Sequence, residues 1–334
     1  MTRRGVWVGL LLLAGSCFSA VAQQRTDTAQ KLPLLYWSQS VDTAAALQKA
    51  GISQMAVPAD NAAVWRQAGF SVTALSQAEL ERREKVPVPR VVGRGNVASA
   101  TTRPWLDANG WRFVRKPTGQ FRYELPAGRA ALALAEASAY GADAVVAFEK
   151  ADLDAAGKML AFLRTVPARQ LPVIADLGVV DDGTPLVGEV LNLLSRRNLL
   201  FKLGSAPVAQ YRVNIKLGTK QYPKAEAADP SEFVQKIRKQ LGDENRSLRV
   251  YGSETVLCRL TGGNGGVRLH LINYGGRDIE GFRVRLRGKF GPGKAYVYGS
   301  EDATLSEFAV LDGATEFSLA RLGVYAVIDL PQAQ

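Results

Sequence analysis

Acidic side chains follow several short apolar runs in this sequence, where an α/β protein places its ligand-binding residues. Glu149 follows the run 144–148, Asp176 lies within the run 171–180, and Asp181 and Asp182 come directly after it. Ligands of parallel sheets and barrels bind beyond the carboxyl ends of the strands, so we expect these acids to gather at one mouth. Hydrolysis of a glycosidic bond needs two carboxyl groups, one protonated and one ionised. The sequence therefore predicts Glu149, paired with Asp181 or Asp182, as the reacting groups.

The same carboxylates also have a structural interpretation. Asp182 can bond the backbone of its Asp-Gly turn or cap a helix that begins at Thr184, and Glu149 can be a solvated loop acid. Asp176 lies among apolar residues, where an unpaired carboxylate is costly. We therefore expect Asp176 to face the mouth or to meet an arginine or backbone donors.

Aromatic residues gather near the end of the first predicted strand and in the segment 104–111. Trp37 belongs to the first group, and Trp105, Asp107 and Trp111 belong to the second. Sugars stack their C–H faces on aromatic rings and hydrogen-bond to carboxylates, so these four residues are candidate substrate-binding residues. A small hydrophobic core under a long loop would use the same composition.

Other catalytic and metal-binding residue types are scarce. The chain has one histidine, His270, and beyond residue 22 its only cysteine is Cys258, so no His/Cys zinc site can form within one mature chain. His270 alternates with apolar neighbours far from any nucleophile, which argues against a Ser-His-Asp triad. We predict neither a metal centre nor a cofactor; oxygen-ligand metals are the only metal class left open.

The N-terminus has the three zones of a cleavable export signal over residues 1–22. Thr2-Arg3-Arg4 supply positive charge, 5–15 are apolar, and Ala20-Val21-Ala22 form a small-residue cleavage site. The apolar run is too short to span a bilayer, so we predict a periplasmic or extracellular protein with no integral membrane segment. A lipoprotein anchored through Cys17 is the alternative, although Ala14 stands where such signals usually carry a larger aliphatic residue.

The chain is strongly basic. Its formal net charge is +11, and loss of Arg3 and Arg4 with the signal lowers it to +9. Arginines pair at 82–83 and 196–197 and alternate along 283–287, which would suit anionic polymers or lipid headgroups. No block of like charge carries interleaved aromatics, so a solvated basic surface is the favoured interpretation and nucleic acid is not an expected partner.

Strand-like and helix-like segments alternate over 32–252. About eight apolar strands alternate with helices, which implies parallel pairing and suffices for a closed barrel. The predicted fold is a compact (β/α)8 TIM-like barrel, with an insertion at 93–125 that contains a hairpin over 111–123. The alternative is two open α/β domains that divide near 94–119.

From Glu254 onward the hydrophobic period changes to two. Val267, Leu269 and Leu271 alternate with Arg268 and His270, and turns rich in glycine, asparagine and aspartate separate such runs. This pattern predicts a small antiparallel β-sandwich of about seven strands over 254–330.

An α/β barrel followed by a short antiparallel sandwich resembles the layout of many glycoside hydrolases, including those of the beta-galactosidase type. The segments 173–202 and 269–274 are similar to segments of bacterial hydrolase-like proteins. The resemblance implies a glycan or polysaccharide ligand and assigns no residue a role. We therefore predict an exported carbohydrate-active protein that hydrolyses glycans with paired carboxylates. A noncatalytic glycan- or envelope-binding protein with a degenerate barrel and an oligomeric structural protein are the alternatives, and the oligomeric state is open.

Overall fold

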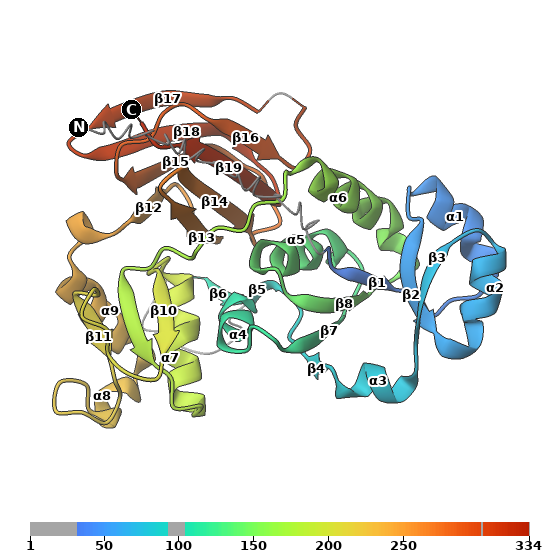
Figure 1. The fold of residues 1–334 in the computed structure, drawn as a ribbon, viewed down its shortest axis with the longest axis horizontal. Coiled ribbons are helices and arrows are strands. Elements are labelled where there is room, and N and C mark those ends of the chain that lie inside the picture. The colour runs from blue at the N-terminus through green and yellow to red at the C-terminus, as the bar shows by residue number, and fades with distance from the viewer. Residues whose placement is uncertain (1–31, 93–103, 302, 334) are drawn as a thin grey trace, which may run out of the picture.

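The computed structural model describes residues 32–92, 104–301 and 303–333. The predicted export signal, with Cys17, and residues 93–103 of the predicted insertion lie outside this part of the chain. Three units make up the described fold: a six-stranded parallel sheet with its helices, a three-stranded parallel sheet with its helices, and an antiparallel sandwich (Figure 1). Over the same residues, no helix is both long and apolar enough to cross a membrane.

The first sheet has the strand order β3-β2-β1-β8-β7-β4, and all its pairs are parallel. Among the described strands, each edge strand, β3 or β4, pairs on one side only, so this sheet is open. The chain moves outward from β1 to β3, restarts at the opposite edge and returns through β7 to β8. The strands are β1 (Leu34–Tyr36), β2 (Gln54–Pro58), β3 (Ser71–Leu75), β4 (Glu84–Lys85), β7 (Gln120–Glu124) and β8 (Asp143–Ala147).

Short helices connect these strands, and local signals fix where they begin. The predicted capping box at the start of α3 is present: Glu79 donates its backbone N–H to Ser76 Oγ, and Ser76 donates its own N–H to the Glu79 carboxylate. The helices are α1 (Ala44–Lys49), α2 (Ala62–Gln67), α3 (Gln77–Arg82), α4 (Gly110–Arg115), α5 (Ala130–Tyr140) and α6 (Leu153–Thr165).

The predicted hairpin over 111–123 is wrong. Its first half is helix α4, and its second half is β7, a parallel strand between β4 and β8. Phe121 and Tyr123 do alternate into the core as a strand requires. Alternation of this kind identifies a strand but does not name its partner, and here the partner is β8, with Phe121 opposite Ala144. The short strands β5 (Arg90–Val92) and β6 (Trp105–Asp107) pair antiparallel beside the sheet.

The second sheet is small and separate from the first. Strand β9 (Leu177–Val180) lies between β10 (Phe201–Gly204) and β11 (Val213–Ile215), and both pairs are parallel. Helices α7 (Pro185–Arg196), α8 (Lys224–Ala227) and α9 (Pro230–Leu241) accompany this sheet. Thr184 caps α7 by accepting from the Val187 N–H, as the Thr-Pro signal predicts.

The described strands therefore form two open parallel sheets, and the predicted closed eight-stranded barrel is corrected. Residues 171–175, predicted as the start of a barrel strand, pair with the sandwich instead: Ile174 donates its N–H to Leu260 O, and Gly262 donates to Pro172 O. That pairing carries the chain away from β8 before β9 begins. The division between the two sheets falls after α6, not near 94–119 as the open-sheet alternative placed it.

The antiparallel sandwich follows, as the change of period predicts. One sheet has the order β12-β15-β18-β17 and the other β13-β14-β19-β16. Phe282, Val284 and Phe317 are among the side chains of its interior. The strands are β12 (Leu248–Tyr251), β13 (Val256–Gly263), β14 (Gly266–Asn273), β15 (Ile279–Arg287), β16 (Lys294–Val297), β17 (Leu305–Leu311), β18 (Ala314–Leu322) and β19 (Tyr325–Pro331).

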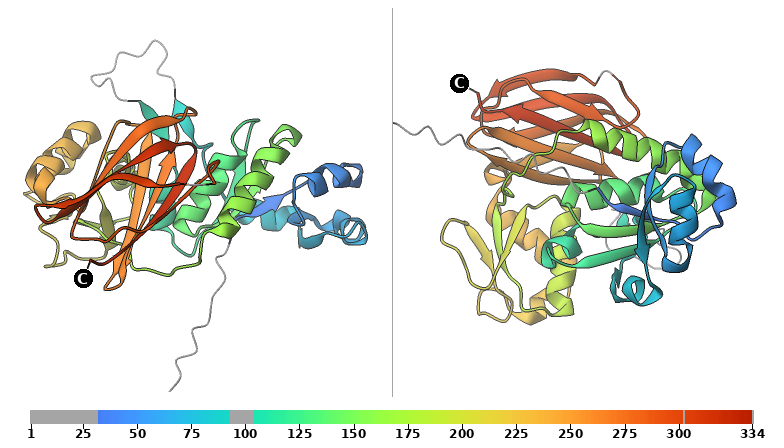
Figure 2. Two further views of the ribbon diagram at one scale, coloured as in Figure 1. Left: turned by 90° about the horizontal axis from the view of Figure 1, so that it is seen from above. Right: turned by 45° about the vertical axis from the view of Figure 1, so that its right-hand side comes forward.

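Strand β14 is buried on both faces. Val267, Leu269 and Leu271 point into the sandwich, while Arg268 and His270 are buried on the other side. Helix α5 packs against both β8 and β14, so it lies between the first sheet and the sandwich (Figures 1 and 2). Nearly every α5 side chain is buried as a result. The small alanine side chains of this helix let both neighbouring layers approach closely.

Candidate ligand-binding site

The four predicted catalytic acids do not meet at one mouth. Glu149 is exposed beyond the carboxyl end of β8 in the six-stranded sheet. Asp181 and Asp182 follow β9 in the three-stranded sheet, whereas Asp176 precedes β9 and so lies at its opposite end. An extended chain advances about 3.3 Å per residue, which puts Asp176 and Asp181 roughly 16 Å apart. None of the four lines the largest cavity described below.

Asp181 forms a two-point ion pair. Arg115 donates from Nε to one carboxylate oxygen at 2.8 Å and from Nη2 to the other at 2.7 Å, and it also donates to Thr184 O at 2.9 Å. Gly183 N donates to the same carboxylate at 2.9 Å. Because both partners are largely shielded from water, this pair fastens α4 to the loop between β9 and α7.

The side chains of Asp182 and Asp176 likewise have structural roles, because each accepts a hydrogen bond from a backbone N–H group. Asp182 accepts from Thr184 N at 2.9 Å and from Thr184 Oγ1 at 2.6 Å, and these bonds hold the pKa of Asp182 below its ordinary value. Asp176 accepts from Ser247 N at 2.9 Å and from Ser247 Oγ at 2.5 Å. Burial raises the pKa of Asp176 despite these donors. Asp176 thus joins the start of β9 to the start of β12.

Replacing Asp181 by alanine is expected to lower the free energy of unfolding by about 2 kcal/mol, because Arg115 loses its partner while still shielded from water. Urea denaturation measures the effect. Asp182→Ala is the matched control, because it removes only the hydrogen bonds of an exposed turn nearby. It should lower the free energy of unfolding by less than half as much. Equal stability of Asp181→Ala and the native protein would contradict the structural assignment.

Two of the predicted sugar-stacking residues are internal. Trp37 is 1% exposed, donates from Nε1 to Thr43 Oγ1 at 2.9 Å and packs 5.5 Å from the Phe148 ring. Trp111 is buried in the core of the three-stranded unit. Both therefore have the core role that was the alternative interpretation.

The other two predicted sugar-binding residues are half-buried and engaged with arginines. The guanidinium of Arg196 lies 4.0 Å from the centre of the Trp105 ring, and Arg90 Nε donates to Asp107 at 3.3 Å. Trp105 therefore stands beside an arginine of the cavity described next.

A cavity of about 550 Å³ lies where the three-stranded unit meets the sandwich. Its polar wall comes from the carboxyl ends of α7 and α9 and from the chain that leads into β12. Five arginines contribute to that wall: Arg196, Arg197, Arg238, Arg246 and Arg249. Asp243 and Glu254 are its two acids, so positive charge predominates.

The wall is fastened by Asn198, which follows α7 with a positive φ of 51°. Its side chain donates from Nδ2 to Val256 O at 2.9 Å and accepts at Oδ1 from Cys258 N at 2.8 Å. Two bonds to neighbouring residues of β13 fix the end of α7 against the sandwich.

Asp243 holds two of the arginines in place. Arg238 donates from Nε at 3.0 Å and from Nη2 at 2.8 Å, and Arg246 donates from Nη1 at 3.2 Å. The hydrogen bond from Arg238 is the largest cause that lowers the pKa of Asp243 to about 2, so this carboxylate is ionised at neutral pH. Arg246 also donates to Arg197 O and Asn198 O at 3.4 and 3.3 Å.

The remaining lining offers hydroxyl groups and apolar surface. Ser231 and Ser253 contribute side chains from α9 and from the turn after β12, and Tyr251 is 44% exposed beside them. Guanidinium groups bind oxygen in pairs, and an aromatic ring accepts the C–H face of a sugar. An oxygen-rich ligand of modest size suits this combination.

Most of this site has no signal in the sequence. The predicted solvated basic patch at Arg196 and Arg197 is wrong, because both side chains are half-buried in the cavity wall. Arg238, Arg246 and Arg249 carried no local signal, because they reach the pair at 196–197 only through packing. The doublet itself, at the end of an amphipathic helix, was the one usable sign.

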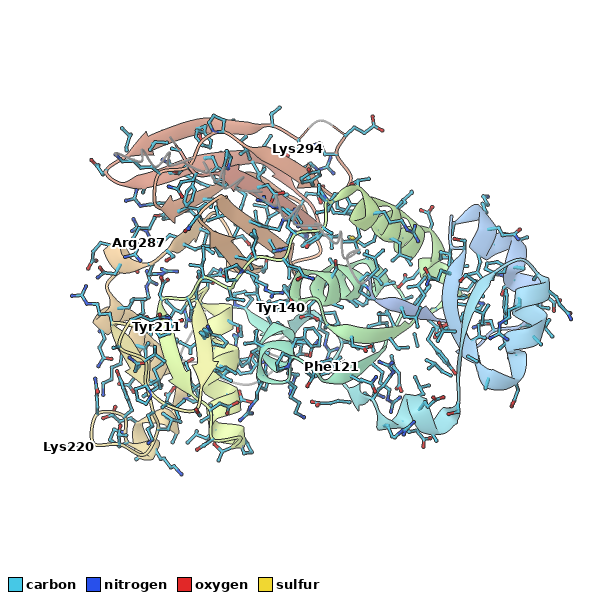
Figure 3. The ribbon with its side chains drawn as sticks, viewed as in Figure 1. Phe121, Tyr140, Tyr211, Lys220, Arg287 and Lys294 are labelled. Atoms are coloured by element: carbon cyan, nitrogen blue, oxygen red, sulfur yellow. The ribbon has the colours of Figure 1, made fainter. Side chains whose placement is uncertain are left out.

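His270 lines a second cavity, of about 520 Å³, together with the end of α5 and residues 168–172. Tyr140, at the end of α5, lies where this helix meets the sandwich (Figure 3). His270 Nδ1 is 2.7 Å from Tyr325 Oη, and burial lowers the pKa of His270 well below its ordinary value. A neutral histidine bonded to a tyrosine fits a core role.

Within the described ranges, no group of three or more His, Cys, Asp or Glu side chains could hold a metal ion. Cys258 is buried, and burial raises the pKa of its thiol.

The fold has counterparts among proteins of known structure, although the sequence matches none of the known families. No protein-family model matches the chain, and no curated protein sequence does. Alpha-L-fucosidase isoenzyme 2 from Paenibacillus thiaminolyticus matches with a TM-score of 0.52 and 9% identity, over 83% of this chain and 71% of the fucosidase. A catalytic mutant of Gan42B, a GH42 beta-galactosidase from G. stearothermophilus, matches with a TM-score of 0.35 and 7% identity, over 83% and 67%. The fold is glycoside-hydrolase-like, as its layout predicts, and this likeness concerns the fold alone.

Proposed function

We propose that this chain, whose fold is glycoside-hydrolase-like, is an exported glycan-binding protein that holds its ligand in the arginine-lined cavity. The cavity is the observation that carries the proposal. Its volume of about 550 Å³ lies within the usual range for small-ligand sites, and its wall combines paired N–H donors, hydroxyl groups and an exposed tyrosine. Export rests on the sequence signal at residues 1–22.

The hydrogen bonds and ion pairs of the predicted catalytic acids argue against hydrolysis by these residues and so favour a binding function. The carboxylates of Asp176, Asp181 and Asp182 already accept hydrogen bonds from backbone and arginine donors. Among the described residues, only Glu149 of the four has no side-chain partner. Glu149 belongs to the six-stranded unit, whereas Asp176, Asp181 and Asp182 belong to the three-stranded unit. Paired-carboxylate catalysis needs two such groups across one bond.

Hydrolysis within the cavity is the second candidate function. Asp243 and Glu254 both line it, and the alpha-L-fucosidase that is similar in fold carries the name of a glycosidase. In that case Asp243, kept ionised and held by Arg238 and Arg246, would stabilise the positive charge of the transition state, and Glu254 would act as acid.

A glycan array followed by calorimetry on the mature chain tests the proposal. The native protein is expected to bind a defined set of glycans, and Ser231→Trp, which fills the cavity without changing its charge, should weaken binding at least tenfold. Ala161→Trp, on the exposed face of α6, is the matched control and should bind normally.

Two results would contradict binding as the function. One is silence across the array, and the other is binding that Ser231→Trp leaves unchanged. Release of reducing sugar that Glu254→Gln abolishes, with binding retained, would establish the second candidate instead.

A further inference from the structure

We infer that the ligand of this cavity is an acidic sugar, one that carries a carboxylate or phosphate group to the wall formed by Arg246 and Arg249. The inference rests on the proposed function, because it names the class of glycan that the same site accepts. Its basis is the charge of the wall and the unfilled hydrogen-bonding capacity of two of its arginines.

Charge is the first argument. Five guanidinium groups line the cavity against two carboxylates, and one of these, Asp243, is already shared between Arg238 and Arg246. A concave wall with this excess concentrates anions, since low-dielectric surroundings strengthen the field inside a cleft. A neutral glycan would leave that field without a counter-charge.

Arg246 supplies the second argument. It is 8% exposed, and burial is the main cause that lowers the pKa of its guanidinium. Its Nη atoms have acceptors, but Nε has none among the described residues. A buried donor without an acceptor costs free energy, and an anion in the cavity would offset that cost by attracting the guanidinium charge.

Arg249 supplies the third argument. It is half-buried in the cavity wall, and no described residue accepts a hydrogen bond from its side chain or pairs with its charge. Arg283 and Arg285 of the neighbouring strand β15, by contrast, share Glu316. A guanidinium left open in a cavity can grip a carboxylate or phosphate through two parallel N–H···O bonds.

Calorimetry with three probes tests the inference on the mature chain. Trigalacturonate carries carboxylates, galactotriose is its neutral counterpart, and galactose 6-phosphate carries a phosphate. We expect an acidic probe to bind at least tenfold more tightly than galactotriose, and this preference should shrink as salt is raised from about 50 to 500 mM, because ions screen the attraction.

Substitutions assign the effect to the wall. Arg249→Ala should weaken the acidic probe by about tenfold to a hundredfold and galactotriose by clearly less, because a neutral sugar loses only hydrogen bonds at this arginine and no charge pairing. Arg249→Lys keeps the charge but loses the two-point geometry, so it should recover part of the loss. Arg164→Ala, on the exposed face of α6, removes an arginine elsewhere and should bind like the native protein. Unchanged thermal unfolding shows that each variant is folded.

Each outcome separates the inference from the proposed function. Preference for trigalacturonate supports a uronate source, and preference for galactose 6-phosphate supports a phosphate source. Equal binding of galactotriose and the acidic probes, insensitive to Arg249→Ala, overturns the inference but leaves glycan binding intact. Absence of binding to all three probes and to the glycan array overturns both.

Discussion

Replacing Glu136 by alanine is expected to lower the free energy of unfolding by about 3–5 kcal/mol, the largest loss we foresee for a polar side chain. Glu136, in α5, is 0% exposed. Its carboxylate accepts from Asn109 N at 2.5 Å and Nδ2 at 3.0 Å, and from the hydroxyls of Tyr123 and Tyr274, each at 2.6 Å. Alanine would leave these donors buried without an acceptor and would open a void among three elements.

Urea denaturation followed by tryptophan fluorescence measures this loss. Tyr274→Phe, which removes a single donor and keeps the ring, is the graded control and should cost about 1 kcal/mol. A loss below 1 kcal/mol for Glu136→Ala would show that water or rearranged neighbours replace the carboxylate.

The pH dependence adds a signed check on the same residue. Burial raises the pKa of Glu136, so the folded state favours its neutral form. The resulting stabilisation is fully present below the pKa of the unfolded chain and is lost as pH rises through the folded pKa. Glu136→Gln cannot titrate and should remove this part of the slope.

Replacing Gly157 by alanine is expected to destabilise the protein by about 3 kcal/mol, although the same change inside an ordinary helix is stabilising. A Cβ atom at Gly157, in α6, would lie 1.9 Å from the carbonyl oxygen of Ala50, at the end of α1. The obstacle is backbone, so no side-chain rotation relieves it, and α1 and α6 would have to separate.

Thermal and urea unfolding measure this effect. Ala161→Gly, on the exposed face of the same helix, is the control for helix propensity and should cost about 1 kcal/mol. A Gly157→Ala protein more stable than the native one would mean that α1 moves freely against α6.

Local signals explain the parts of the fold that could be predicted from the sequence. The capping box at Ser76 and the Thr184-Pro185 start of α7 depend on contacts within one turn, and the alternation of the sandwich strands depends on a single buried face. Pairing between distant strands has no such signal. The run 171–180 illustrates this, because its first half pairs with β13 and only residues 177–180 enter a parallel sheet.

The same limit explains the outcome at the candidate site. Asp181 does follow a parallel strand, as predicted, but β9 and β8 belong to different sheets, so Glu149 is not its neighbour. Asp176 was placed in the middle of a strand that in fact begins one residue later. The cavity arginines come from α7, α9 and the approach to β12, and only tertiary packing reveals that these segments share a wall.

The two hydrogen bonds between the Asn198 side chain and β13 bear on how quickly a ligand would be captured. Because the end of α7 is tied to the sandwich through both Val256 and Cys258, the two sides of the cavity are held at a fixed separation before any ligand arrives. Capture would then need no domain closure, and its rate would be governed by diffusion and electrostatic steering. Differences in affinity between ligands would then lie mainly in the rate at which each complex dissociates.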